Sequence, residues 1–375
     1  MRIGIACYPT YGGSGVLATE LGKALADQGH EIHFITYKVP VRLNVLAKNI
    51  HFHEVNVSQY PLFEYKPYEL VLTSKIVDVA RYEKLDVLHV HYAIPHASAA
   101  YMAKEILKSH GINLPIITTL HGTDITLVGK DPSFEPVITF AINNSDAVTA
   151  VSDSLKNDTF KNFGVNRPIE VIHNFVNMEK YEDKPCKKHL FSEDGEVVIS
   201  HVSNFRKVKR IQDIIHSFKL VREKVNAKLL LVGEGPERNQ MEKLCRDLKI
   251  CDQVHFLGNI QNVEEVLCLS DIFMLTSESE SFGLAALEAM AAKNAVISSN
   301  TGGIPEVNEH GVTGYLSKVG DIEDLAKNTI ELIEDREKLE QFKKNAYEKA
   351  KTFDISQIMP IYLELYDRVL ASQWT

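Results

Sequence analysis

Short apolar runs alternate with amphipathic segments along almost the whole chain. The apolar runs predict strands, because strands of a buried parallel sheet consist of nearly continuous apolar residues. They fall at residues 3–7, 32–36, 87–91, 116–120 and 147–151 in the first half, and at 197–202, 228–232, 254–257, 272–275 and 295–298 in the second. The amphipathic segments predict helices at residues 16–28, 97–109, 211–223, 238–248 and 284–292. This alternation is typical of α/β layers built on parallel sheets.

The same strand–helix pattern occurs twice, which predicts two doubly wound, Rossmann-like domains. A length of 375 residues exceeds what one hydrophobic core usually holds. We expect an N-terminal domain over residues 1–170 and a C-terminal domain over 171–354, with the linker at 181–189 or at 174–177. The pattern turns helical after Asp321. Residues 355–375 are expected to form a terminal helix that packs back on the first domain.

Composition and charge narrow the classes of partner. Apolar residues make up 45% of the chain and charged residues 24%, as in an ordinary globular protein. The net charge of −9 argues against nucleic acid as the main partner, which would require a basic surface. No apolar run is long enough to span a membrane, and the first residues resemble a strand rather than a signal peptide. Five scattered cysteines without a C-x-x-C pair favour a cytoplasmic protein. The oligomeric state stays open, a homo-oligomer included.

A glycine-rich turn follows the first predicted strand. Residues 11–15 read Tyr-Gly-Gly-Ser-Gly and lead into a helix. Glycines let a ligand approach the backbone, and free N–H groups at a helix start attract anions. The spacing differs from the G-x-G-x-x-G of nicotinamide-binding folds, and the second strand ends in Thr36-Tyr37 rather than an acidic residue. A tight turn without a ligand is the alternative interpretation.

A basic loop follows the first strand of the second half. Residues 203–210 read Ser-Asn-Phe-Arg-Lys-Val-Lys-Arg, directly before a predicted helix. Arginine and lysine are the usual partners of a diphosphate, and the loop lies where a doubly wound fold binds its ligand. We therefore expect Arg206 and Lys209 to hold a diphosphate. A solvated surface loop is the alternative.

Two glutamates in the second half are the most specific signal. Glu280 and Glu288 flank the sequence Ser-Phe-Gly-Leu-Ala-Ala-Leu, which spans a loop and the start of a helix. Glu280 precedes the helix and Glu288 projects from it, so both carboxylates can face one ligand. A capping carboxylate beside an exposed helical glutamate is the alternative.

Two pairs of histidines raise the question of a metal site. His51 and His53, and likewise His89 and His91, occupy alternate positions of predicted strands, so each pair shares a face of its strand. Zinc usually requires at least three protein ligands, and no carboxylate or cysteine partner is evident near either pair. We expect these histidines to lie in the core or in a cleft wall, and we expect no metal site.

These motifs together resemble the retaining glycosyltransferases of family four. The resemblance covers nearly the full chain and is carried by the following segments: 12–15, 121–124 (His-Gly-Thr-Asp), 203–210, 232–237, 280–290 and 302–306. It implies the GT-B fold, in which the active site lies in the cleft between two Rossmann-like domains. It also implies a UDP-sugar-dependent hexosyltransferase.

Further segments resemble the family members that act in bacillithiol biosynthesis; these are residues 18–23, 29–36, 91–96, 120–126 and 202–210. This resemblance implies transfer of N-acetylglucosamine from UDP-N-acetylglucosamine to L-malate. The catalytic residues that it implies are His121, Arg206, Lys209 and Glu280. The implied donor-binding residues are Gly13, Ser14, Gly15, Asn204, Gly258, Phe282, Gly283, Leu284 and Glu288. Many members have Gly-Arg where this chain has Ser203-Asn204, so Arg206 would supply the guanidinium.

The acceptor and the mechanism are less fixed by the sequence. Malate has two carboxylates, so its pocket needs hydrogen-bond donors, for which the candidates are Ser14, Lys66, Tyr92 and Thr123. The family implies a single-face mechanism in which a donor phosphate oxygen takes the acceptor proton. We assign no general base, and we expect no metal cofactor because the cations can stabilise the leaving group.

We consider four alternative functions, two of which the motifs disfavour. A UDP-N-acetylglucosamine 2-epimerase would bind the same donor, and another family-four enzyme would use a different small acceptor. A nicotinamide oxidoreductase conflicts with the glycine spacing. A non-catalytic sugar-nucleotide-binding protein would lack the combination of basic loop and paired glutamates.

Overall fold

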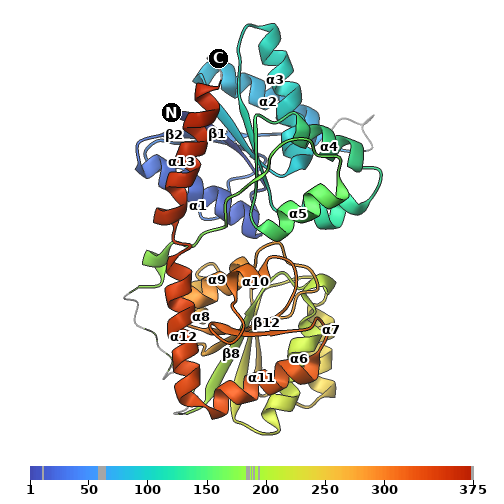
Figure 1. Cartoon of the computed structure of the whole chain (residues 1–375), viewed down its shortest axis with the longest axis vertical. Helices are drawn as coiled ribbons and strands as arrows, with labels where there is room; N and C mark the ends of the chain where they lie inside the picture. The colour runs from blue at the N-terminus through green and yellow to red at the C-terminus, as the bar shows by residue number, and fades with distance from the viewer. Residues whose placement is uncertain are drawn as a thin grey trace. The chain divides into compact units, whose positions relative to one another are not determined.

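The computed structural model describes residues 1–10, 12–57, 65–182, 186, 188, 191–192 and 195–372. The chain divides into two compact units (Figure 1). Unit 1 comprises Met1–Asn174 and Ile355–Thr375, and unit 2 comprises Phe175–Asp354. No helix within the described residues is long and apolar enough to span a bilayer.

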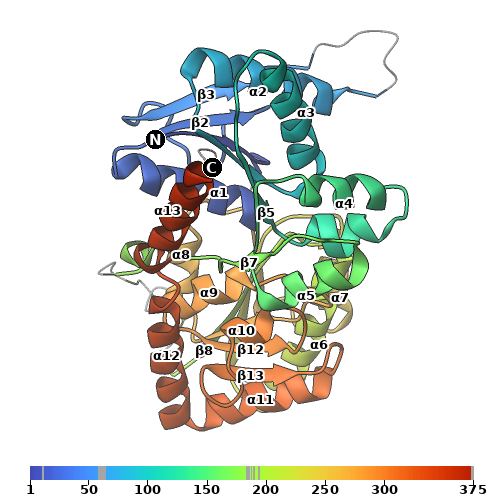
Figure 2. The same cartoon turned by 45° about the horizontal axis from the view of Figure 1, so that its top comes forward.

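Unit 1 is built on a parallel sheet with the strand order β3-β2-β1-β4-β5-β6-β7. The strands are β1 Arg2–Ala6, β2 Glu31–Thr36, β3 Ile50–Glu54, β4 Val87–His91, β5 Ile116–Leu120, β6 Ala147–Ala150 and β7 Glu170–Val171. β4 and β5 are buried along their whole length, including their histidines and threonines. β3 is the edge strand beside β2 (Figure 2). β1 lies between β2 and β4. Strands that follow β1 are first added on the β2 side and then, from β4 on, on the other side, so the strand order reverses between β1 and β4.

Helices cover the sheet of unit 1; they are α1 Gly13–Asp27, α2 Tyr68–Glu83, α3 Ser98–Ser109, α4 Glu135–Asn143, α5 Asp153–Asn162 and α13 Ile355–Ala371. Short helical turns at Ala93–Ala97, Thr123–Leu127 and Val128–Lys130 follow β4 and β5. Local sequence sets some of the helix starts. The Ser152 hydroxyl, for example, accepts a hydrogen bond from the Leu155 amide at 3.0 Å and caps α5.

The terminal helix α13 packs beside α1, although some 330 residues separate them (Figures 1 and 2). Tyr366 of α13 is fully buried, and its hydroxyl lies 2.8 Å from Nδ1 of His89 in β4. The other ring nitrogen of His89 lies 2.7 Å from the Thr119 hydroxyl. The helix therefore supplies a polar partner that a buried histidine needs, and it is part of the core of unit 1.

Unit 2 repeats the architecture with the parallel strand order β10-β9-β8-β11-β12-β13. The strands are β8 Val197–Val202, β9 Ala227–Val232, β10 Val254–Gly258, β11 Ile272–Leu275, β12 Ala295–Ser299 and β13 Gly314–Ser317. The helices are α6 Ile211–Arg222, α7 Arg238–Asp247, α8 Val263–Leu267, α9 Leu284–Ala291, α10 Ile304–Val307, α11 Ile322–Glu334 and α12 Arg336–Lys351. Here the strand order reverses at the β8/β11 pair.

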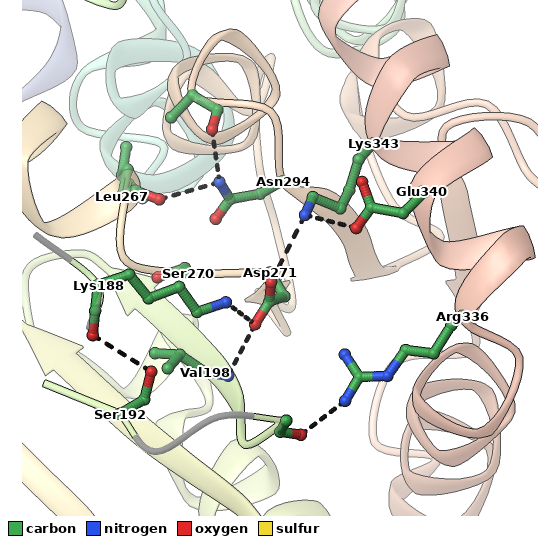
Figure 3. Close-up of polar contacts among 12 residues, drawn as sticks. Lys188, Ser192, Val198, Leu267, Ser270, Asp271, Asn294, Arg336, Glu340 and Lys343 are labelled. Atoms are coloured by element: carbon green, nitrogen blue, oxygen red, sulfur yellow. Dashed lines mark hydrogen bonds and ion pairs between the residues drawn. The ribbon is translucent and has the colours of Figure 1, made fainter. Parts of the chain in front are cut away.

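A buried carboxylate fixes the start of that central strand pair (Figure 3). Asp271 directly precedes β11 and accepts a hydrogen bond from the Val198 amide at 3.0 Å. It also pairs with the ammonium groups of Lys188 at 2.5 Å and Lys343 at 3.5 Å (Figure 3). Two cations and an amide compensate for the burial of this charge, so the amino ends of β8 and β11 are held in register.

The predicted central elements agree with the observed ones to within one to three residues at nearly every end. Three strands were not predicted, and all three are edge or near-edge elements. β3 has the polar sequence Ile-His-Phe-His-Glu, β7 has only two residues, and β13 lies at the edge of the second sheet. Strands of this kind lack the continuous apolar run that marks a central parallel strand.

Candidate functional site

In unit 2 the predicted motifs meet at the carboxyl ends of β8 and β11. The basic loop follows β8, and residues 276–283 follow β11. The strand order reverses between these two strands, and it is outside the carboxyl ends of strands at such a point that doubly wound proteins bind ligands.

Lys209 and Glu280 form an ion pair between the loops that follow β8 and β11. The ammonium nitrogen lies 2.6 Å from Oε2 of Glu280, and the Ser277 hydroxyl donates to the same oxygen at 3.2 Å. Both side chains of the pair remain partly exposed, at 23% for Lys209 and 18% for Glu280. A ligand can therefore reach both charges, and the pair is already positioned before one binds.

Backbone contacts hold the two loops together. The Thr276 hydroxyl donates to the carbonyls of Lys209 and Arg210, each at 3.1 Å, and the Glu278 amide donates to Val208 at 2.8 Å. Arg210 pairs with buried Asp213 at 2.6 Å, so this guanidinium anchors the start of α6. Among the four cations of the loop, Lys209 therefore contacts the glutamate motif and Arg210 does not face it.

Arg206 and Asn204 lie in the same loop with exposed side chains. Between them, Phe205 is fully buried, and its amide donates to the Glu234 carbonyl at 2.9 Å. The Arg206 amide donates to the Asn204 carbonyl at 2.8 Å. Phe205 thus fixes the loop in the core and leaves its two polar neighbours at the surface.

A buried histidine supports the first residue of this loop. Nδ1 of His201 lies 2.8 Å from the Met274 carbonyl, which can only accept, so Nδ1 carries the proton. Nε2 therefore accepts from the Ser203 hydroxyl at 2.7 Å. Burial lowers the pKa of His201 to about 4, and the ring stays neutral at pH 7.

Gly233 and Gly258 bring a second pair of strand ends close to the basic loop. The Gly233 amide donates to the Gly258 carbonyl at 2.8 Å, and both residues have positive φ, at 130° and 69°. A Cβ on Gly233 would overlap the Ser203 carbonyl oxygen. The glycine is therefore required for the close approach of the two loops.

The segment after Glu280 forms the start of α9. Gly283 has φ 97° and precedes the first helical residue, Leu284. The ring of Phe282 is buried and lies edge-to-face on Phe353 at 5.7 Å, so only its backbone can serve a ligand. Glu288 lies one turn into the helix and is half-buried. The structure thus places the two glutamates on a loop and on the helix that follows it.

In unit 1 the glycine-rich turn lies at the carboxyl end of β1, at the point where the strand order reverses. Tyr11 is outside the described residues. α1 begins at Gly13, three residues earlier than expected, because Gly13 and Ser14 adopt helical geometry. The Gly15 amide donates to the Gly12 carbonyl at 3.1 Å, and a Cβ on Gly15 would overlap the backbone of Tyr8. Gly15 thus serves the turn itself, while Gly13 and Ser14 form the first helical turn.

Three acceptor candidates come together in unit 1. The Ser14 and Tyr92 hydroxyls are 2.7 Å apart, and the Tyr92 hydroxyl also hydrogen-bonds the side chain of Thr123. Burial raises the pKa of Tyr92 to about 12, so it remains a donor at neutral pH. Lys66 lies ahead of α2 with an exposed side chain, and the described contacts do not join it to the other three.

His121 belongs to a row of histidines beside this group. Its Nε2 lies 2.8 Å from Nδ1 of His91, and the two rings stack at 5.0 Å. Burial lowers the pKa of His121 to about 3.

Asp124 accepts hydrogen bonds from the Ala93 amide at 2.8 Å and the Gly122 amide at 3.1 Å, which joins the loops after β4 and β5. Burial raises the pKa of Asp124 to about 6.

The histidine pairs correct two expectations, one of which is that His51 lies in the core or in a cleft wall, because its side chain is exposed. His89 and His91 are buried, as expected. His53, however, does have a carboxylate neighbour, because Glu83 at the end of α2 lies close to it and to His33 of β2. The expectation of no carboxylate was wrong because Glu83 is thirty positions away in sequence and approaches only through the fold.

A cavity of about 1260 Å³ in unit 2 lies away from these motifs. Residues lining it include Lys188, Asp271, Lys293 and Lys343. Asp271 precedes β11, so the cavity lies toward the amino ends of the strands, opposite to the end where doubly wound folds bind their ligands. None of the motif residues named above lines it.

Most of the supporting residues could not have been identified from local motifs. Ser277, His201 and Asp124 each hold a predicted site loop through a buried or half-buried polar contact. Such residues are common in cores, and only their partners in space distinguish them. A signal existed for Asp124 alone, as part of the His-Gly-Thr-Asp segment.

Comparison with known proteins identifies the family. The model described as "Glycosyltransferase Family 4" matches residues 11–180, and "Glycosyl transferases group 1" matches residues 183–349. N-acetyl-alpha-D-glucosaminyl L-malate synthase of Bacillus anthracis is 49% identical over 373 residues, which cover 97% of each protein. The chain belongs to glycosyltransferase family 4.

Solved structures of other proteins share the fold of this glycosyltransferase. Sucrose-phosphate synthase from Thermosynechococcus elongatus superposes with a TM-score of 0.82 at 20% identity, over 99% of this chain and 100% of that one. Anabaena Alr3699/HepE in complex with UDP and glucose has a TM-score of 0.82 at 21% identity, over 98% and 99%. The predicted GT-B class, with two parallel-sheet Rossmann-like domains, is confirmed. The family assignment does not favour the epimerase.

Proposed function

We propose that this glycosyltransferase moves N-acetylglucosamine from UDP-N-acetylglucosamine to the hydroxyl of L-malate, in the first step of bacillithiol biosynthesis. One observation carries the proposal: 49% identity, over 97% of both proteins, to a synthase named for that product. The family-wide motifs support sugar transfer in general, whereas an identity of this extent supports the particular donor and acceptor.

The geometry of unit 2 supports its role in binding the donor. Loss of the sugar leaves negative charge on the diphosphate, and a prepositioned cation stabilises that charge most strongly in the transition state. Lys209 has this property because Glu280 and the loop contacts fix it in advance. We assign the diphosphate to Lys209 and Arg206, with Asn204, Gly258 and the start of α9 as further donor contacts.

In this proposal Glu280 and Glu288 bind different parts of the donor. Glu288 would accept hydrogen bonds from the ribose hydroxyls, and Glu280 from the sugar hydroxyls. A bound sugar and diphosphate would then add contacts to Glu280 and Lys209 while these two side chains stay paired with one another. The partial exposure of both side chains is consistent with such added contacts.

The acceptor is assigned to unit 1. Ser14, Tyr92 and Thr123 present a group of hydroxyls suited to a carboxylate or to an attacking alcohol. His121 would contact the donor sugar as a neutral ring, since its pKa is far below 7. The first-turn amides of Gly13 and Ser14, together with Gly15, would serve an anion. Lys66 remains a candidate for the second carboxylate of malate.

Retention and metal independence complete the proposal. A donor phosphate oxygen would take the proton of the malate hydroxyl on the face that UDP leaves, so no protein base is assigned. The cations would replace a metal at the diphosphate. We also propose a cytoplasmic location, supported by five free cysteines, the state that a reducing compartment maintains.

Release of UDP tests both substrates at once. The protein would be incubated with UDP-N-acetylglucosamine and, separately, with L-malate, D-malate, L-lactate or buffer, with and without a chelator. We expect UDP to form rapidly only with L-malate and at a rate that the chelator does not change. Proton NMR of the product would report the anomeric configuration, which we expect to be α.

Three results would contradict different parts of the proposal. If L-malate gives no more UDP than buffer, the acceptor is wrong, although the family assignment stands. A β-configured product would exclude retention. Loss of turnover with chelator, restored by a divalent cation, would exclude metal-independent catalysis.

A further inference from the structure

Three side chains from separate elements converge at the edge of the unit 1 sheet, outside the site described above. Nδ1 of His33 in β2 lies 2.9 Å from Nε2 of His53 in β3. With the carboxylate of Glu83, the last residue of α2, they present three ligand atoms that all lie within 4.8 Å of one another. No role in the proposed reaction is assigned to any of the three.

The two imidazoles are in the state that binds a metal. Burial lowers the pKa of His33 to about 4 and also lowers that of His53, so both rings are neutral at pH 7. Two neutral rings facing each other can share one proton in a hydrogen bond. Alternatively, each can direct a lone pair at one cation and carry its proton on the other nitrogen.

The distances are compatible with the second arrangement. Zinc–nitrogen bonds of 2.0–2.1 Å at a tetrahedral angle separate two ligand nitrogens by about 3.3 Å. The observed 2.9 Å would need to widen by only a few tenths of an ångström. Glu83 is exposed at the end of its helix, so its side chain can move to complete the set.

The surrounding charges do not exclude a cation. Glu83 favours positive charge near His53, and Lys75 opposes it. Arg2 is paired with Glu31 at 2.7 Å, which neutralises its effect on His33. His51 stacks on His33 with ring centroids 4.7 Å apart and shields one face of the group.

We infer that His33, His53 and Glu83 form a binding site for a divalent late transition metal, with zinc the best match to two imidazoles and a carboxylate. The role we assign to it is to connect elements of the fold. It would join the edge strand β3 and the end of α2 to the inner strand β2, at the side of the sheet where β3 has a single neighbour. Three protein ligands leave one position for solvent.

Metal binding to the full-length protein tests this inference directly. The native protein and three variants would be stripped with chelator and titrated with Zn²⁺ in competition with a chromophoric chelator. The variants are His53→Gln, Glu83→Gln and His110→Ala, the last removing an exposed histidine at the end of α3 as a matched control. Melting temperature would be recorded with and without Zn²⁺, and Co²⁺ absorption would report the ligand geometry.

We expect one Zn²⁺ site in the native protein and in His110→Ala, with a rise of several degrees in melting temperature. Both ligand variants should bind Zn²⁺ at least about tenfold more weakly and lose that rise. Exposed Cys186 and Cys251 give a background that is equal in all four proteins. Because Glu83 is exposed, Glu83→Gln should fold even if His53→Gln does not, as circular dichroism would show.

Equal zinc affinity and equal melting shifts in the native protein and Glu83→Gln would overturn the inference. So would a native protein that shows no site above the thiol background. Neither result would bear on sugar transfer, which is measured separately by UDP release.

Discussion

At the scale of single residues, the Lys209–Glu280 pair is the most informative contact. A partly exposed ion pair adds little to the stability of a fold. The pair, however, joins the two loops where the strand order reverses, and Ser277 holds the same carboxylate oxygen. We therefore infer that the pair contributes to catalysis rather than to stability. A cation that is fixed before the reaction needs no reorganisation when charge develops on the leaving group.

This assignment predicts different kinetic effects for two alanine variants. Lys209→Ala should lower kcat by about 100-fold or more with little change in UDP affinity, since the cation acts mainly on developing charge. Glu288→Ala should weaken UDP binding by about tenfold or more, because it removes a ribose contact. Steady-state kinetics and calorimetric titration with UDP would measure both. Lys207→Ala, an exposed cation of the same loop, is the control and should resemble the native enzyme.

The two variants also test the division of roles. Equal losses of affinity and turnover in both would show that Lys209 and Glu288 act on the same state of the donor. The proposed split between binding and catalysis would then be wrong.

The residues of this site differ in how far the sequence reveals them. Glu280 and Glu288 were predictable because their spacing falls at a strand–helix junction. The contact of Lys209 with Glu280 was not, since 71 residues separate them and four cations compete for the role. Only the fold shows that Arg210 is engaged by Asp213 and that Lys209 faces the glutamate.

At the scale of elements, the loop before α9 depends on a glycine of the loop before α10. Gly302 has φ 54°, and the Gly303 amide donates to the Glu280 carbonyl at 3.0 Å. A Cβ on Gly302 would overlap that same carbonyl oxygen. The position of Glu280 is therefore set partly by an element that contributes no side chain to the site.

Gly302→Ala should lower kcat by about 100-fold, because the Glu280 backbone must shift and a displacement near 1 Å has effects of this size. Gly311→Ala is a matched control: Gly311 also has positive φ, at 78°, but no atom lies within 4 Å of its added Cβ. Both variants should lose about 1 kcal/mol of stability from backbone strain. UDP release and denaturant unfolding would separate the effects, and equal kcat values would refute the steric argument.

Strand prediction succeeded where both faces of a strand are buried and failed at three of the four sheet edges, since the edge strand β10 was predicted. Central strands such as Val87–His91 were located to the residue, because both faces are covered and most positions are apolar. β3 was missed because its edge position tolerates His51, His53 and Glu54. One of the polar residues that hid this strand, His53, is a ligand of the inferred metal site.

At the scale of the whole molecule, buried and half-buried histidines are distributed unevenly. Those with a lowered pKa on a strand of the unit 1 sheet, or in the segment directly after one, are His33, His53, His89, His91, His96 and His121, and the pKa of His30, just before β2, is lowered as well. In unit 2 the described counterpart is His201. Burial is the main cause in every case, so folding requires each ring to stay neutral.

This distribution predicts that acid unfolds unit 1 before unit 2. Each such histidine has a folded pKa below the unfolded value near 6.5, so the unfolded chain binds more protons between those values and stability falls as pH falls. Each contributes up to about 1.4 kcal/mol per pH unit, and six acting together rival a total stability of about 5–15 kcal/mol. Asp124, with its raised pKa of about 6, has the opposite sign, but it is one group against six.

Hydrogen exchange followed by mass spectrometry between pH 7 and pH 4.5, corrected for the intrinsic rate, would locate the loss of protection. We expect β4 and β5 to lose protection at a higher pH than β8 and β11. Chelator should be present throughout, because acid would also release a cation from His33 and His53 and destabilise the same sheet. If β8 and β11 open first, the buried histidines of unit 1 must be protonated without unfolding. Their low pKa values, and with them the neutral state assigned to His121, would then be wrong.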